Sequence, residues 1–286
     1  MLSLALGIVF AAPQAAPSFI RFPDLHGSHV AFTSEGDIWI GDLETRTAKR
    51  LTSDPGVERN VSFSPDGKSL AFEGEYDSRQ AYVMPTNGGI PKRLTYAEGF
   101  RAVTDWSADG KNVIFRTTNV PTNYQMASVP ATGGVPKPFP LEFVSHMTFA
   151  PDGQRYAFTR FNRWYSAWFH YDGGMQNQIW VREGGPTQFR QVTNTPGTNE
   201  FPAWCGDRIY FVNEHKGKFT LMSVPASGGE VRAELPPSDT EVREMDTDGK
   251  RLIFERGVGA EVFDPATRKA TPISFQMASD EIHARP

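Results

Sequence analysis

A ten-residue phrase occurs three times in the chain with small variations. It reads FSPDGKSLAF from Phe63, WSADGKNVIF from Trp106 and FAPDGQRYAF from Phe149, a spacing of 43 residues. A repeat of this length is typical of β-propellers and of a few helical arrays. The segments between the phrases alternate apolar and polar residues with a period of two and are rich in Val, Ile, Phe, Tyr and Thr, which is the pattern of β-strands. No segment has a sustained helical periodicity, so the repeat predicts an all-β protein.

Each phrase contains a turn signal. In x-Pro-Asp-Gly the proline fixes φ at about −65°, the aspartate can accept hydrogen bonds from its own backbone, and glycine adopts the positive φ of a tight turn. We therefore predict a turn between the first two strands of each unit. A second signal, Pro-x-x-Gly-Gly, predicts the turn from the third strand to the fourth. A calcium role is not favoured, because further oxygen ligands at alternate positions do not accompany the turn aspartates Asp66, Asp109, Asp152 and Asp248.

Six units can be counted, and each has room for four antiparallel strands. They cover residues 18–56, 57–99, 100–142, 143–197, 198–238 and 239–275. This number predicts a six-bladed β-propeller. Neither terminal unit lacks a strand, so we expect the first blade to pack on the last without a shared closing strand. Aromatic side chains at equivalent positions are expected to fill the spaces between blades, namely Phe63, Trp106, Phe149 and Trp204.

The composition limits the partners and the compartment. The chain has 286 residues, a net charge of −4 and no run of five like charges, which argues against binding to nucleic acid or an anionic membrane. Residues 1–17 resemble a secretory signal peptide that lacks its positive start, so we expect an exported, periplasmic protein, with a cytoplasmic one as the alternative. No segment has the ~20 apolar residues that span a bilayer. The single cysteine, Cys205, is expected to fill the core.

Three longer phrases resemble one known family. They are FPDLHGSHVAFTSEGDIWIGDL from Phe22, YDGGMQNQIWVREGG from Tyr171 and the segment from Gln191 to Val224, within which FPAWCGDRIYF from Phe201 is the most specific. In these phrases the chain is similar to the first, TolB-like propeller of the tricorn protease family. Asp172 and Gln178 depart from that family, which tends to have arginine and aspartate there.

The resemblance implies a larger protein. Tricorn-like proteins carry two propellers, a small barrel, a PDZ domain and a serine peptidase core. Residues 276–286 would then be a linker toward a following domain, and homo-oligomers are possible. The main hypothesis is a non-catalytic propeller that guides peptides or docks other domains or subunits of a peptidase. The alternatives are a freestanding exported TolB-like scaffold for protein partners and, less favoured, a propeller hydrolase with a metal in the channel.

No sequence motif indicates that this chain is itself a catalyst. It lacks the G-x-S-x-G of a serine nucleophile and the G-x-x-x-x-G-K of a phosphate loop. His26 and His29 lack a convincing third ligand for a metal. We therefore predict no catalytic residues, no cofactor and no metal in this chain, whose parent family is of the serine peptidase type.

Two groups of residues are candidates for binding. Polar residues that enter the innermost strands are candidates for contact with a peptide in the central channel, and the more ordinary interpretation is that they are solvated strand ends: Arg59, Arg101, His146, Glu200 and Arg243. An insertion in the fourth unit is rich in aromatic residues, which mark an interface or pack within the chain: Trp164, Tyr165, Trp168, Phe169 and Tyr171.

Overall fold

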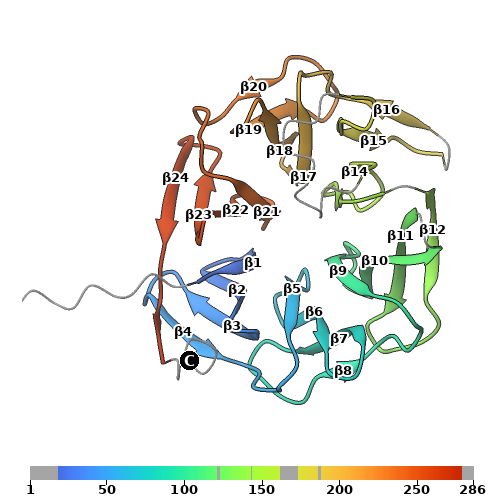
Figure 1. The fold of residues 1–286 in the computed structure, drawn as a ribbon, viewed down its shortest axis with the longest axis vertical. Helices are drawn as coiled ribbons and strands as arrows, with labels where there is room; N and C mark the ends of the chain where they lie inside the picture. Colours follow the sequence, from blue (N-terminus) through green and yellow to red (C-terminus); the bar gives the residue numbers. More distant parts are fainter. Residues whose placement is uncertain (1–18, 121–122, 143, 162–172, 186–187, 279–286) are drawn as a thin grey trace, which may run out of the picture.

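The protein is a ring of six β-sheets around a central axis, as the computed structural model shows (Figure 1). The structure describes residues 19–120, 123–142, 144–161, 173–185 and 188–278. Within these residues every regular element is a β-strand. Each sheet contains four antiparallel strands in chain order, and the first strand of each sheet lies nearest the axis. The predicted six-bladed propeller is confirmed.

The strands fall inside the six predicted units. Blades one to three contain β1 (Arg21–His26), β2 (His29–Ser34), β3 (Asp37–Asp42) and β4 (Thr47–Arg50), then β5 (Glu58–Phe63), β6 (Ser69–Glu75), β7 (Arg79–Pro85) and β8 (Lys92–Arg93), then β9 (Arg101–Trp106), β10 (Asn112–Val120), β11 (Asn123–Pro130) and β12 (Lys137–Glu142). Blades four to six contain β13 (Met147–Phe149), β14 (Tyr156–Phe158), β15 (Trp180–Arg182) and β16 (Phe189–Gln191), then β17 (Thr198–Cys205), β18 (Arg208–His215), β19 (Lys218–Pro225) and β20 (Arg232–Ala233), then β21 (Val242–Thr247), β22 (Leu252–Arg256), β23 (Gly259–Asp264) and β24 (Lys269–Ile273).

The repeated turn has the predicted geometry. Between β5 and β6, Gly67 has a φ of 69° and donates its N–H to the carbonyl of Ser64 at 2.8 Å. The carboxylate of Asp66 accepts the hydroxyl of Ser64 at 2.7 Å and the N–H of Lys68 at 3.1 Å. These two bonds lower the pKa of Asp66. The aspartate therefore closes its own turn. Asp109 makes the same two bonds, whereas Asp152 and Asp248 each accept two backbone N–H groups of their turn.

Apolar side chains fill the space between neighbouring blades. An apolar cluster lies at each of the six blade contacts. Trp106 is buried between blades two and three, and its indole N–H donates to the carbonyl of Ser62 at 3.1 Å. Phe63 and Trp204 are also buried at such contacts, while Phe149 is half-buried. Cys205 is buried between blades five and six, so its predicted role in the core is confirmed.

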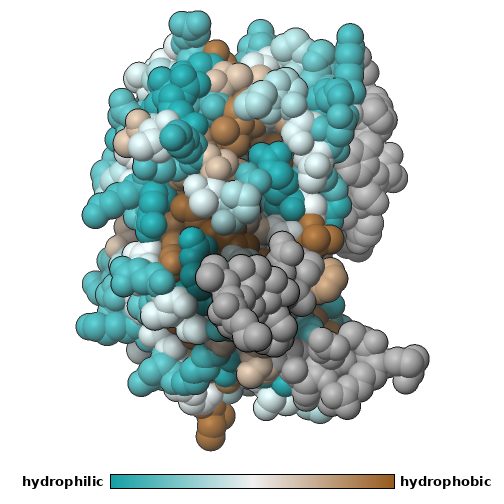
Figure 2. Space-filling view, turned by 90° about the vertical axis from the view of Figure 1, so that its left-hand side faces the viewer, coloured by the Kyte–Doolittle hydropathy of each residue, from teal (hydrophilic) through white to brown (hydrophobic). Residues whose placement is uncertain are grey.

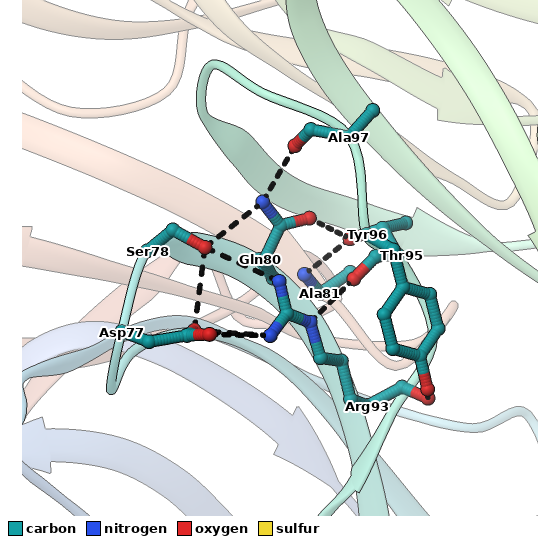
Figure 3. A network of polar contacts seen from close by, with 8 residues as sticks. All are labelled: Asp77, Ser78, Gln80, Ala81, Arg93, Thr95, Tyr96 and Ala97. Carbon is teal, nitrogen blue, oxygen red and sulfur yellow. Dashed lines mark hydrogen bonds and ion pairs between the residues drawn. The ribbon is translucent and has the colours of Figure 1, made fainter.

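A polar network ties the third strand of blade two to the end of its fourth strand (Figure 3). The hydroxyl of Thr95 donates to the side chain of Gln80 at 2.7 Å and accepts the N–H of Ala81 at 3.0 Å. Arg93 donates to the carbonyl of Thr95 at 2.7 Å. These bonds satisfy polar groups that the short strand β8 leaves without a ladder partner.

The same network occurs in blade four, at one of the departures from the resembled family. Gln178 accepts the hydroxyl of Thr193 at 2.8 Å and the side-chain amide of Asn199 at 2.9 Å. Its own amide donates to the carbonyl of Thr195 at 3.0 Å. The glutamine therefore keeps the acceptor at this position and adds a donor that an aspartate lacks.

A short strand from the end of the chain extends blade one. β25 (Gln276–Met277) pairs in parallel with β4, so that Gln276 lies opposite Thr47 and Met277 opposite Ala48. The four strands of each blade still come from one continuous stretch of chain, as predicted. The fifth strand of blade one is not predicted from the sequence, because two residues are too few to show a period of two. These two residues lie in the predicted linker 276–286.

A glycine at the entry to an inner strand, Gly197, allows the crossover loop to pass close to the second strand of the blade that it enters, while Gly206 lies in the turn between β17 and β18. A Cβ built on Gly197 would lie 2.1 Å from the carbonyl oxygen of Glu214, whereas one built on Gly206 would meet nothing within 4 Å. Both glycines have positive φ, 84° and 61°.

We expect Gly206→Ala to cost about 1–2 kcal/mol of unfolding free energy for the left-handed backbone. Gly197→Ala should cost roughly 1–3 kcal/mol more, because its Cβ would also clash with the backbone.

Urea unfolding of the two variants measures this difference directly. Equal losses in the two variants would show that the close approach at Gly197 is not a constraint on the fold.

Candidate functional site

Four of the six innermost strands share a β-bulge that faces the axis. In β1, β5, β17 and β21 the pairing register shifts at the same position, and the bulged residue is not glycine although its φ is positive: Phe22 (49°), Asn60 (53°), Phe201 (52°) and Glu244 (42°). Such a backbone costs on the order of 1–3 kcal/mol at each residue. Bulges re-aim side chains and are common beside functional sites. All four residues line one cavity on the axis.

This axial cavity has a volume of about 70 Å³. Arg116 and His146 also line it, and so do residues of β9, β13 and β21. The volume accommodates a few water molecules. It does not accommodate an extended peptide without side-chain movement. A second hollow of about 290 Å³ lies toward the Pro-Asp-Gly turns and shares four lining residues with the first: Ser62, Asp105, Thr148 and Asp246. The two hollows therefore adjoin along the axis.

Three aspartates lie at the level where the two hollows adjoin. Asp24, Asp105 and Asp246 occupy equivalent positions in β1, β9 and β21, two residues after the bulge position. Asp24 accepts the N–H of Leu25 at 2.5 Å and, from the next blade, the N–H of Phe63 at 2.6 Å. Burial, and then repulsion from Asp246, raises the pKa of both Asp24 and Asp105. Burial raises the pKa of Asp246 to about 7.

These side chains also connect neighbouring blades. The carboxylate of Asp105 accepts the N–H of Phe149, which belongs to blade four. At the same position in blade four, the hydroxyl of Thr148 accepts the N–H of Trp204 from blade five at 3.1 Å. The ring of polar groups on the axis is therefore both part of the channel wall and a set of bonds between blades.

His146 lies beside a serine and a glutamate, but the three do not form a catalytic triad. Its Nδ1 is 3.1 Å from the hydroxyl of Ser145 and 3.8 Å from a carboxylate oxygen of Glu200, so both neighbours approach the same ring nitrogen. A triad needs the acid and the nucleophile on opposite nitrogens. Ser145 is also fully buried. Burial, and then the Arg116 charge, lowers the pKa of His146 well below its usual value, so the contact with Glu200 is not an ion pair at neutral pH.

The predicted channel residues are only partly brought together. His146 lines the axial cavity, and Glu200 lies beside it and accepts the side-chain amide of Asn177 at 2.8 Å. The arginines are held elsewhere. Arg59 pairs with Glu75 at 3.0 Å, and Arg243 pairs with Glu241.

Arg101 has a structural environment. It is buried and donates to the hydroxyl of Thr117 at 2.6 Å and to the carbonyl of Glu98 at 3.0 Å, which fixes the loop that enters β9. The aromatic candidates of the blade-four insertion, Trp164, Tyr165, Trp168, Phe169 and Tyr171, lie outside the described residues.

Apart from His146, sequence reasoning missed the residues that line the cavity. The bulged residues Phe22, Asn60, Phe201 and Glu244 differ in chemistry, so no residue type marks the position. A sequence signal was present two residues after the bulge position, since Asp24, Asp105 and Asp246 stand at the same place in three units.

The described part of the chain offers no metal site of three His, Cys, Asp or Glu side chains. His26 packs against the ring of Phe63 at 5.7 Å, and His29 lies 3.8 Å from Asp42. The described residues also contain no helix long and apolar enough to cross a membrane.

Comparison with known proteins identifies the family. The family model described as the tricorn protease N-terminal beta propeller domain matches residues 17–269. The chain belongs to this family. Tricorn protease homolog 1 of Streptomyces coelicolor is 32% identical over 84% of the chain and 23% of its own length. The tricorn protease of Thermoplasma acidophilum is 27% identical over 91% of the chain and 25% of its own length.

The solved structures agree with this assignment. A crystal structure of the tricorn protease superposes with a TM-score of 0.82 at 27% identity, over 93% of this chain and 27% of that one. The chain thus spans about a quarter of the length of these relatives. A TolB structure from Agrobacterium tumefaciens, at 19% identity and a TM-score of 0.64, shows a likeness of fold alone.

The axial carboxylates, whose pKa values are raised, predict that stability falls as pH rises. Burial, and then repulsion from Glu255, raises the pKa of Glu244 to about 8. The folded protein holds this proton while the unfolded chain releases it at its ordinary pKa of 4.5, so unfolding free energy is lost between about pH 4.5 and pH 8 and is constant above. Asp246 contributes in the same direction up to about pH 7. We expect Glu244→Gln to reduce the loss of unfolding free energy between pH 5 and pH 9 by a few kcal/mol.

Urea unfolding at pH 5, 7 and 9 measures the slope. The exposed Glu230 provides the control substitution, Glu230→Gln, which should leave it unchanged. A wild-type slope that Glu244→Gln does not alter would show that Glu244 is ionised in the folded protein.

Proposed function

We propose that this chain is the non-catalytic propeller of a tricorn-like peptidase, where it guides peptides or docks other parts of the enzyme. The observation that carries the proposal is the match of residues 17–269 to the tricorn N-terminal propeller. Hydrolysis is then the task of the rest of such a protein. The geometry of Ser145 and His146 supports this division, because both neighbours of the imidazole use one nitrogen and the serine is buried.

The axial hollows favour guidance of peptides over simple docking. They form a path lined by apolar and polar side chains in turn, from Phe22, Asn60 and Phe201 to the carboxylates at the junction. A path that narrows to about 70 Å³ passes a peptide only if the side chains at that level move. His146 and Phe201 are in contact there, with ring centroids 4.7 Å apart. We infer that this pair sets the width of the path.

The width of the path can be changed at His146, whose backbone is not among the positive-φ residues. In a peptidase that contains this chain, we expect His146→Trp to slow peptide turnover several-fold because the larger ring fills the cavity, and His146→Ala to leave turnover unchanged or faster. The chain alone should hydrolyse no peptide. Steady-state hydrolysis of fluorogenic peptides measures each case.

The control is His29→Trp, at an imidazole that is half exposed away from the axis. If turnover by His146→Trp equals that of His29→Trp, the axis is not a peptide path and docking remains. Hydrolysis by the homogeneous chain would overturn the non-catalytic role itself.

We also propose that the protein is exported to the periplasm. The support is the apolar segment 1–17, which lies outside the described residues. Mass spectrometry of the protein purified from its own cells should give a mature N-terminus near residue 18. A chain that retains Met1 would instead favour the cytoplasmic alternative.

A further inference from the structure

The contact between blades one and six differs from the other blade contacts in its connectivity. Between consecutive blades, the chain passes from the outer strand of one directly to the inner strand of the next. Blades six and one have no such crossover, because blade one contains the first four strands of the chain and blade six contains β21 to β24. Instead the chain leaves β24 and reaches the outer edge of blade one, where β25 pairs with β4 (Figure 1). This contact must therefore be held by non-covalent interactions.

Phe275 is the main apolar group of this connection. It is buried, and its ring stacks on Phe32 of blade one with centroids 5.4 Å apart and planes at 10°. It belongs to the cluster that joins blades one and six, which also contains Ile273 and Ala260 of blade six. The side of the molecule that carries β4 and β24 has a mostly hydrophilic surface, with some apolar residues exposed between hydrophilic ones (Figure 2).

A glycine in β3 makes room for the ring. A Cβ built on Gly41 would lie 2.6 Å from two ring atoms of Phe275. Gly41 is not among the positive-φ glycines, so its backbone conformation is open to other residues. Space for the ring is therefore the physical reason for a glycine at position 41.

Backbone bonds complete the connection. The N–H of Gln276 donates to the carbonyl of Arg46 at 2.7 Å, and Gln276 and Met277 pair with β4. Nearer the axis, the N–H of Phe22 donates to Glu255 of blade six at 2.6 Å. The blade contact thus has an inner part at Glu255 and a separate outer part at Phe275.

We propose that the outer edge of blade one is a strand-binding site, formed by the free edge of β4 and the pocket over Gly41, which takes an extended segment carrying a phenylalanine. Its occupant is the chain's own segment Phe275–Met277, and this occupation closes the ring. The mode is strand addition, in which backbone bonds give affinity and a side-chain pocket gives specificity. The inference does not depend on the proposed function, because it concerns the closure of the ring alone.

The test first removes the occupant and then supplies it as a separate peptide. The variant Phe275→Ala/Gln276→Pro loses both the ring and the N–H that bonds Arg46. We expect its Tm to fall by about 10 °C. We also expect backbone amides of blades one and six to exchange faster, as followed by hydrogen–deuterium exchange mass spectrometry.

A synthetic peptide with the sequence of residues 271–278, TPISFQMA, should then bind in trans. At millimolar concentration we expect it to recover at least half of the lost Tm and to slow exchange in β4, because a ligand of the folded state alone stabilises it by mass action. The peptide with alanine in place of phenylalanine should have no effect.

Matched variants separate the site from general loss of core. Gly41→Ala fills the pocket and should lower the Tm without rescue by the peptide, whereas Gly259→Ala, whose Cβ would meet nothing within 4 Å, should change little. Phe211→Ala removes a buried ring between blades four and five, and faster exchange should stay in those blades. The proposal is overturned if the double variant keeps its Tm, if both peptides rescue it equally, or if exchange rises evenly around the ring.

Discussion

Packing between blades is the interaction on which the rest of the structure depends. A four-stranded sheet has two faces, and one blade alone cannot remove both from water. Six clusters between blades bury these faces. Polar side chains on the axis also bond the inner strands of blades one and two, three and four, and four and five. Because the blades taper toward the axis, the same packing leaves a narrow path there. Fold and candidate site therefore have one physical origin.

Much of the fold could be predicted from the sequence because its signals are local. The Pro-Asp-Gly and Gly-Gly turns are determined by the φ values that their own residues accept. An aromatic side chain also recurs at the same place in four of the six units, as Phe63, Trp106, Phe149 and Trp204. The bulges at Phe22 and Asn60 could not be predicted, because they depend on the register of a partner strand. The strand β25 was equally hidden, since its two residues have meaning only beside β4.

The candidate site was less accessible to sequence reasoning than the fold. A polar residue at the start of an inner strand was expected to face the axis, but arginine is long enough to reach other partners. Arg59 reaches Glu75 and Arg101 reaches Thr117, while the shorter His146 remains on the cavity. Side-chain length, together with the carboxylates supplied by neighbouring strands, thus decides which residues line the path. Under the proposed function, a narrow path lined by such residues would select which peptides pass.

A structure of the whole peptidase with a bound peptide, determined by cryo-electron microscopy, tests the central claim most directly. If the propeller guides peptides, density for an extended chain will lie on the axis between the hollow at the Pro-Asp-Gly turns and the cavity of the bulged residues, with His146 and Phe201 displaced from their contact. An axis closed by those two side chains, with the peptide bound along another surface of the propeller, would contradict the account.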